Sequence, residues 1–124
     1  MAANKLVRFG PVALSATLTT NILNPGTTTG GTGMPSTSTN LYFVIKHFRI
    51  VNKTAGAVTY TLYIGATGAN AAGTEFGGIA NSIAANSYVD WYGQLTLDVA
   101  DFLVGGASAG TSLTFEAEGE LGIR

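Results

Sequence analysis

The stretch SLTFEAEGELGI, residues 112–123, carries the most regular alternation of apolar and polar side chains in this sequence. Its even-numbered positions from 114 to 120 hold a threonine and then three glutamates, whereas its odd-numbered positions are almost all apolar. A period of two predicts an antiparallel strand with one buried and one solvated face. The side chains expected to face the core are Leu113, Phe115, Ala117, Leu121 and Ile123.

The same period recurs at residues 11–20, 41–52, 58–65 and 95–99. Segments rich in Gly and Asn, such as NKTAGA and GGASAG, supply turns between these stretches. No segment has a sustained helical period, and the best helix candidate, GGIANSIAAN, is interpreted as strand and loop because of its asparagines. We therefore expect an all-β fold, an antiparallel β-sandwich of jelly-roll type with seven to eight strands and an N-terminal strand or arm.

Charged side chains are scarce. They make up 10% of the 124 residues, against about 25% in a typical soluble domain. Monomers use surface charge to stay soluble and to protect sheet edges. One interpretation is a small neutral sandwich that is soluble alone. We favour the other, in which further subunits cover the surface, and we expect a homo-oligomer with a trimer as one candidate.

The few charges are also segregated along the chain. The first 53 residues hold five of the six basic residues and no acid, and all seven acids follow, so the two parts carry formal charges of +5 and −6. This asymmetry predicts electrostatic matching between the two parts, within one subunit or across a contact. Five dispersed cations form a poor phosphate track, and the longest apolar run, 41–45, is far too short for a membrane helix. We therefore expect no nucleic-acid partner and no membrane partner.

The sequence shows no recognisable set of catalytic residues. The only histidine, His47, lies in a predicted strand and is interpreted as a packing or hydrogen-bonding residue, and there is no cysteine to act as nucleophile or metal ligand. The glycine-rich segments lack the lysine and the helix of phosphate-binding loops. Glutamates 116, 118 and 120 are expected to be solvated or to face basic residues of a partner. The chain is thus predicted to be no enzyme, with no catalytic residue, cofactor or metal site.

The sequence divides into three parts by composition. Residues 1–26 contain a strand region, residues 27–40 form a polar linker or loop rich in Gly and Thr, and residues 41–124 form the continuous β-sandwich domain. Such a linker is flexible, so residues 1–26 are a candidate assembly arm that adds a strand to a neighbour's sheet. The equally weighted alternative places 11–24 in the chain's own sandwich, with 27–40 as a long surface loop. The candidate interface residues of this region are Lys5, Arg8, Val12, Leu14 and Leu18.

Two exposed aromatic residues are the other candidates for partner binding. In SYVDWYGQL the alternation places Tyr88, Asp90 and Tyr92 on one face and Val89 with Trp91 on the other. We expect Trp91 to enter the core and Tyr88 and Tyr92 to remain exposed. Exposed aromatics form interface hot spots or stack on sugar rings, so both interpretations are kept.

Two long segments resemble a known group of proteins. The stretches KHFRIVNKTAGAVTYTLYIGATG and AANSYVDWYGQLTLDVADFLVGGASAGTSLTFEAEGEL are similar to small virion structural proteins of tailed bacteriophages, over about two-thirds of the chain from Leu41 to Arg124. The resemblance implies a capsid decoration (cement) protein that stabilises a phage head, or a tail, collar or fibre component. Its partners would be further copies of itself and other virion proteins such as the major capsid protein, in the virion and in the host cytoplasm during assembly. A carbohydrate-binding β-sandwich module is the alternative from another class.

Overall fold

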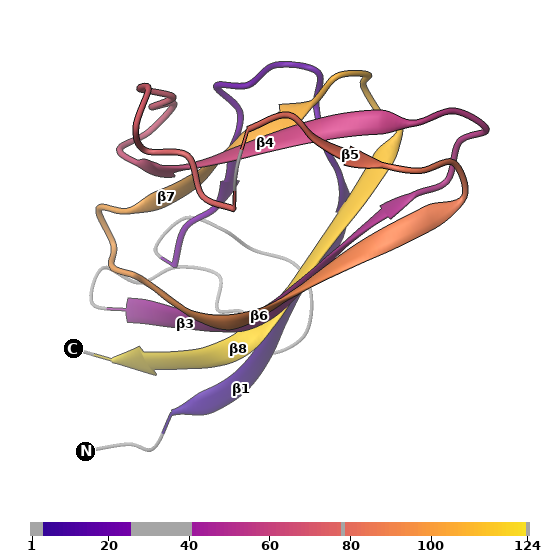
Figure 1. Cartoon of the computed structure of the whole chain (residues 1–124). Coiled ribbons are helices and arrows are strands. Elements are labelled where there is room, and N and C mark those ends of the chain that lie inside the picture. Colours follow the sequence, from indigo (N-terminus) through magenta and orange to yellow (C-terminus); the bar gives the residue numbers. More distant parts are fainter. Residues whose placement is uncertain (1–3, 26–40, 78, 124) are drawn as a thin grey trace.

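The computed structural model describes residues 4–25, 41–77 and 79–123, and these contain eight strands in two antiparallel sheets and no helix (Figure 1). The first sheet, sheet A, has the order β1 (Lys5–Ala13), β8 (Leu113–Ile123), β3 (Leu41–Asn52), β6 (Ser87–Leu97). The second, sheet B, has the order β2 (Asn21–Leu23), β7 (Phe102–Ala107), β4 (Val58–Gly65), β5 (Asn81–Ile83). The expected all-β fold and strand number are confirmed. Over the described ranges, no helix has the length and apolarity needed to cross a membrane.

A single apolar core lies between the two sheets. Sheet A contributes the three rings of Phe43, Phe48 and Phe115, and sheet B contributes Leu62 and Leu103, all at most 2% exposed. The alternation that defines β8 is confirmed at its four inner positions from 113 to 121, which are buried. Its last member, Ile123, is instead 64% exposed because it lies at the end of the strand.

The N-terminal region differs from the expected single strand at 11–20. Strand β1 begins earlier, at Lys5, and ends at Ala13, and residues 14–20 form the connection to β2 in the other sheet. The connection is held against β7, because Ala107 N donates to Ser15 O and Gly105 N donates to Thr20 O. A Cβ at Gly106 would lie 2.5 Å from Ser15 O, so only glycine permits this close approach.

Both N-terminal strands pair within their own chain in this structure. Strand β1 pairs with β8, and β2 pairs with β7. Residues 5–24 thus contribute to both sheets, as in the second interpretation of this region. Exchange of these strands between copies stays a prediction, and the predicted linker at 27–40 falls outside the described residues.

Strand β3 contains one extra residue relative to β8, and its pairing with β6 shifts register at the same place. Ile45 lies opposite Gly119 and His47 lies opposite Glu118, so Lys46 has no counterpart on β8. The resulting β-bulge lets both Ile45 and Phe48 point into the core, although they stand three positions apart. It also directs His47 to the outer face of sheet A. A Cβ at Gly119 would lie 1.9 Å from Val44 O, so glycine is required opposite the bulge.

Candidate functional site

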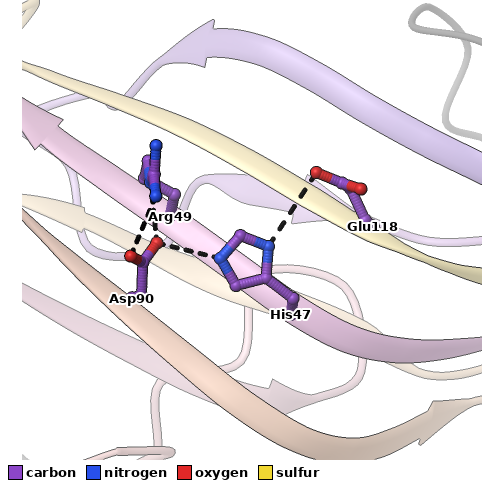
Figure 2. Close-up of polar contacts among 4 residues, drawn as sticks. All are labelled: His47, Arg49, Asp90 and Glu118. Atoms are coloured by element: carbon purple, nitrogen blue, oxygen red, sulfur yellow. Dashed lines mark hydrogen bonds and ion pairs between the residues drawn. The ribbon is translucent and has the colours of Figure 1, made fainter.

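A network of four polar side chains lies on the outer face of sheet A. His47 and Arg49 come from β3, Asp90 comes from β6, and Glu118 comes from β8 (Figure 2). We call these four residues the charged network. It joins three adjacent strands whose sequence positions are far apart, and it brings basic residues of the first part of the chain against acids of the second. The predicted electrostatic matching thus occurs within one subunit.

The strand register places these groups side by side. Arg49 is the cross-strand partner of Asp90 on one side and of Glu116 on the other. His47 is the partner of Glu118. Residues two apart on a strand share a face, so His47 and Arg49 both point outward once the bulge at Lys46 has reset the alternation.

The strongest contact in the network joins Arg49 to Asp90. The guanidinium donates from Nε to Oδ1 at 2.7 Å and from Nη2 to Oδ2 at 3.0 Å, which is a two-pronged arrangement. Hydrogen bonds from Arg49, and then from His47, lower the pKa of Asp90 to about 2, while its hydrogen bond to Asp90 raises the pKa of Arg49. Asp90 is therefore ionised at neutral pH and acts only as an acceptor.

This ionised carboxylate determines the roles of the two His47 nitrogens. His47 Nε2 lies 2.9 Å from Asp90 Oδ1, and because the carboxylate has no proton, Nε2 must be the donor. In the neutral ring, Nδ1 then carries the lone pair. It faces Glu118 at 3.9 Å from Oε1, which is beyond hydrogen-bond distance. The expectation that His47 is a hydrogen-bonding residue is confirmed.

Two tyrosines flank the charged network. The ring of Tyr92 stacks on His47 with centroids 4.6 Å apart, and the Arg49 guanidinium lies 4.5 Å from the ring centroid of Tyr88. Tyr92 is 71% exposed and Tyr88 is 55% exposed, as predicted. Trp91 points the other way, as predicted, and stacks on the buried Phe48 at 5.3 Å.

The basic candidates of the N-terminal region also lie on sheet A. Lys5 and Arg8 are exposed on β1, and Arg8 is the cross-strand partner of Glu118. Arg8 therefore extends the rows of charge on the outer face by one strand. The contact of Lys5 and Arg8 with a partner protein stays a prediction.

The apolar interface candidates of the N-terminal region mostly pack within their own chain. Leu14 is 2% exposed, and Val12 is half-buried against the core. Leu18 is half-buried and lines a hollow of about 230 Å³ with Thr61 and Gly106 on sheet B. In this structure none of these three forms an exposed apolar surface, so their use in an interface would require the strand exchange discussed above.

Two residues of the charged network, His47 and Glu118, also belong to a group of three side chains with the atoms to bind a metal ion. The sequence did not predict this group. One ligand atom each from His47, Glu116 and Glu118 lie within 4.8 Å of one another. The side chains come from β3 and β8, and the carboxylates belong to the row of glutamates that was expected only to be solvated or to face a partner. The ion-pair partners of the imidazole among the described residues are the carboxylates of Asp90 and Glu118.

Sequence reasoning missed the partnership of Arg49 with Asp90 and the place of Glu118. The relevant signal is the change of alternation within 41–52, where inner residues are odd-numbered at Phe43 and Ile45 and even-numbered at Phe48 and Ile50. Such a change indicates a bulge, and a bulge re-aims the neighbouring side chain.

No family model matches this chain, and searches of curated proteins and of solved structures returned no match.

Proposed function

We propose that the chain is a non-enzymatic structural protein of a virion, a capsid decoration (cement) protein that stabilises a phage head through contacts with copies of itself and with the major capsid protein. Three features support this proposal: the order of the strands, the exposed apolar side chains on sheet A, and the scarcity of charge.

The strand order supports a jelly-roll fold. The first strand pairs with the last, β2 with β7, β3 with β6, and β4 with β5. This nesting arises when one long antiparallel hairpin is rolled up into two sheets, and eight-stranded jelly rolls recur in viral capsid and lectin domains. A fold alone does not assign a function, so the proposal rests on the side chains exposed at the surface.

The observation that carries the proposal is the exposure of large apolar and aromatic side chains on sheet A. Leu6 on β1 is 83% exposed, Tyr92 and Tyr88 on β6 are 71% and 55% exposed, and Ile123 ends β8 at 64%. Within the described residues, β1 and β6 are the outer strands of the sheet and have no further strand beside them. Exposed edges with apolar side chains favour association, and the charges of Arg49 and Asp90 between them are paired within the chain.

The mechanism is adhesive. Each contact buries apolar surface such as that of Leu6 and adds hydrogen bonds at a sheet edge. Repetition of a weak contact on a symmetric lattice sums to firm attachment, because each bound copy raises the effective concentration of the next contact. A lattice held in this way resists rupture.

The first test is the mass of the purified protein by light scattering over a dilution series, followed by electron microscopy of what forms. We expect an oligomer that persists on dilution and decorates phage heads. Leu6→Lys should shift the oligomer towards monomer, whereas the control Val99→Lys, at another exposed apolar position, should not. A protein that is monomeric at every concentration and does not bind heads contradicts the proposal. Particles with tail, collar or fibre symmetry would favour a role in that part of the virion instead of the head.

The exposed tyrosines favour carbohydrate binding as a second candidate function. Tyr88 and Tyr92 lie on one face of β6 with the polar Asp90 between them, an arrangement that can stack on and hydrogen-bond to a sugar. Trp91 takes no part in this candidate because its ring packs against the core. Saturable binding on a glycan array that is lost in Tyr92→Ala would favour this function, and a blank array would exclude the glycans tested.

A further inference from the structure

We propose that the outer face of sheet A holds a site for a divalent transition-metal ion of the zinc class, with His47 Nδ1 and the carboxylates of Glu116 and Glu118 as ligands and Asp90 as the positioning residue of His47. The site lies beside the exposed residues Leu6 and Tyr92 but does not depend on the adhesive function proposed above.

The donor atoms suit this class of metal. A neutral imidazole nitrogen and carboxylate oxygens are zinc ligands, with bonds of about 2.0–2.2 Å. Tetrahedral ligands at that bond length lie about 3.4 Å apart. The three donor atoms here lie within 4.8 Å of one another, so they must close by at most about 1.4 Å. Glu118 can make this movement because its side chain is 54% exposed and free to change rotamer.

A separate observation points to a cation on the Nδ1 side of His47. Nε2 is engaged by Asp90 at 2.9 Å, which leaves Nδ1 directed at the Glu118 carboxylate at 3.9 Å. A cation placed between these two atoms would be bound by both. Metal-binding histidines commonly donate their other ring N–H to a carboxylate, which orients the ring and raises its basicity. Asp90 occupies that position.

The site is open to solvent and only partly neutralised. A shallow hollow of about 260 Å³ is lined by His47 and Glu118, which gives an ion a route of entry. The arginines opposite the two glutamates, Arg8 and Arg49, offset part of the negative charge. Arg49 is already engaged by both oxygens of Asp90.

The first experiment is calorimetric titration of the tag-free, chelator-treated protein with zinc chloride at pH 7. We expect one saturable site per chain. Glu118→Gln should weaken binding at least about 10-fold, and Asp90→Asn should weaken it about 10- to 100-fold, the usual effect of losing an outer-shell partner. Glu120→Gln is the matched control, since Glu120 lies on the same strand and pairs with Lys46 outside the ligand set. Equal weakening by Glu118→Gln and Glu120→Gln, or no saturable binding, would overturn the proposal.

A second measurement does not depend on any variant's stability. The chain has one histidine, so a long-range proton–nitrogen NMR spectrum of the unmodified protein reports His47 alone. Before zinc is added, we expect Nε2 to carry a proton, because it donates to Asp90. Zinc should move the Nδ1 resonance and leave Nε2 protonated. An unchanged Nδ1 resonance at saturating zinc, or coordination through Nε2, contradicts the assignment.

Discussion

The clearest stability prediction concerns Asn52, a fully buried amide at the end of β3. The two hydrogens of its Nδ2 are shared among three carbonyl oxygens, Gly56 O at 2.9 Å, Ile83 O at 2.9 Å and Ala84 O at 3.2 Å. Its Oδ1 accepts from the backbone N and the hydroxyl of Thr54 at 3.0 and 2.7 Å. One side chain thus holds the turn after β3 against β5.

The magnitude follows from these partners. Asn52→Ala removes the buried hydrogen bond to the Ile83 carbonyl, which costs about 1–3 kcal/mol, and removes partly solvated contacts worth about 0.5–1 kcal/mol each. The free energy of unfolding should therefore fall by about 3 kcal/mol. With a urea dependence of about 2 kcal/mol per molar for a chain of this size, the unfolding midpoint should fall by about 1.5 M.

The chain supplies a matched control. Asn81 lies in β5 and its Nδ2 is buried with no hydrogen-bond partner among the described residues. Asn81→Ala should change the free energy of unfolding by less than about 1 kcal/mol, because no hydrogen bond of the amide nitrogen is lost. Urea unfolding followed by tryptophan fluorescence measures both variants. Equal midpoint shifts in the two variants would refute the assignment of the stability to the hydrogen bonds of Asn52.

An isosteric change sharpens the test. Asn52→Asp keeps the shape but replaces a donor by a carboxylate that faces three carbonyl oxygens. Those oxygens and burial raise the pKa of the introduced carboxyl in the folded state. A folded-state pKa above the unfolded value means relative stability is lost as pH rises, so this variant should be least stable against the parent at neutral pH and recover towards pH 4. A constant difference over that range contradicts the geometry.

Three further predictions follow from the strands around the charged network. Gly119→Ala should lower the free energy of unfolding by about 1–3 kcal/mol or more in urea titrations, because the new Cβ meets Val44 O. Hydrogen bonds from Arg49 and then His47 lower the pKa of Asp90 to about 2. The ionised Asp90 should therefore stabilise the folded state above about pH 4, and this stability should be lost as pH falls from 4 to 2. Asp90→Asn should remove this part of the pH dependence of unfolding. Deletion of residues 1–26 should abolish cooperative unfolding in circular dichroism, because β1 and β2 supply core residues to both sheets; a folded, merely unassembled product would support a detachable arm.

The alternation predicted sheet A better than sheet B, and the reason is local. On β4 a period of two would leave Thr61 and Tyr63 on a solvated face, but they are 5% and 8% exposed. The segment after β4 folds back, so that Phe76 N donates to Leu62 O, and Ala80 N donates to the Thr61 hydroxyl. A period of two reports which side chains share a face, but it does not report whether a loop covers that face.

The charge pattern likewise predicted one feature of the candidate site but not its individual contacts. Segregation of basic and acidic residues along the chain predicted that they attract one another, and Arg49 with Asp90 shows this within one subunit. Which cation meets which acid depends on the register of three strands that are distant in sequence. Register is set by the packing of the inner face, so the identity of a polar pair on the outer face follows from core residues and not from the charges themselves.

The bulge at Lys46 connects the core to the candidate site. With unbroken alternation, β3 could bury Phe43 and Ile45 or Phe48 and Ile50, but not both pairs. Burying both requires one extra residue between them, and the glycine opposite, Gly119, leaves room for it. The side chain that follows the extra residue must then point outward, and it is His47. Hydrophobic packing thus sets where the only histidine of the chain meets Asp90 and Glu118, so the chemistry of the outer face is a consequence of how the inner face is filled.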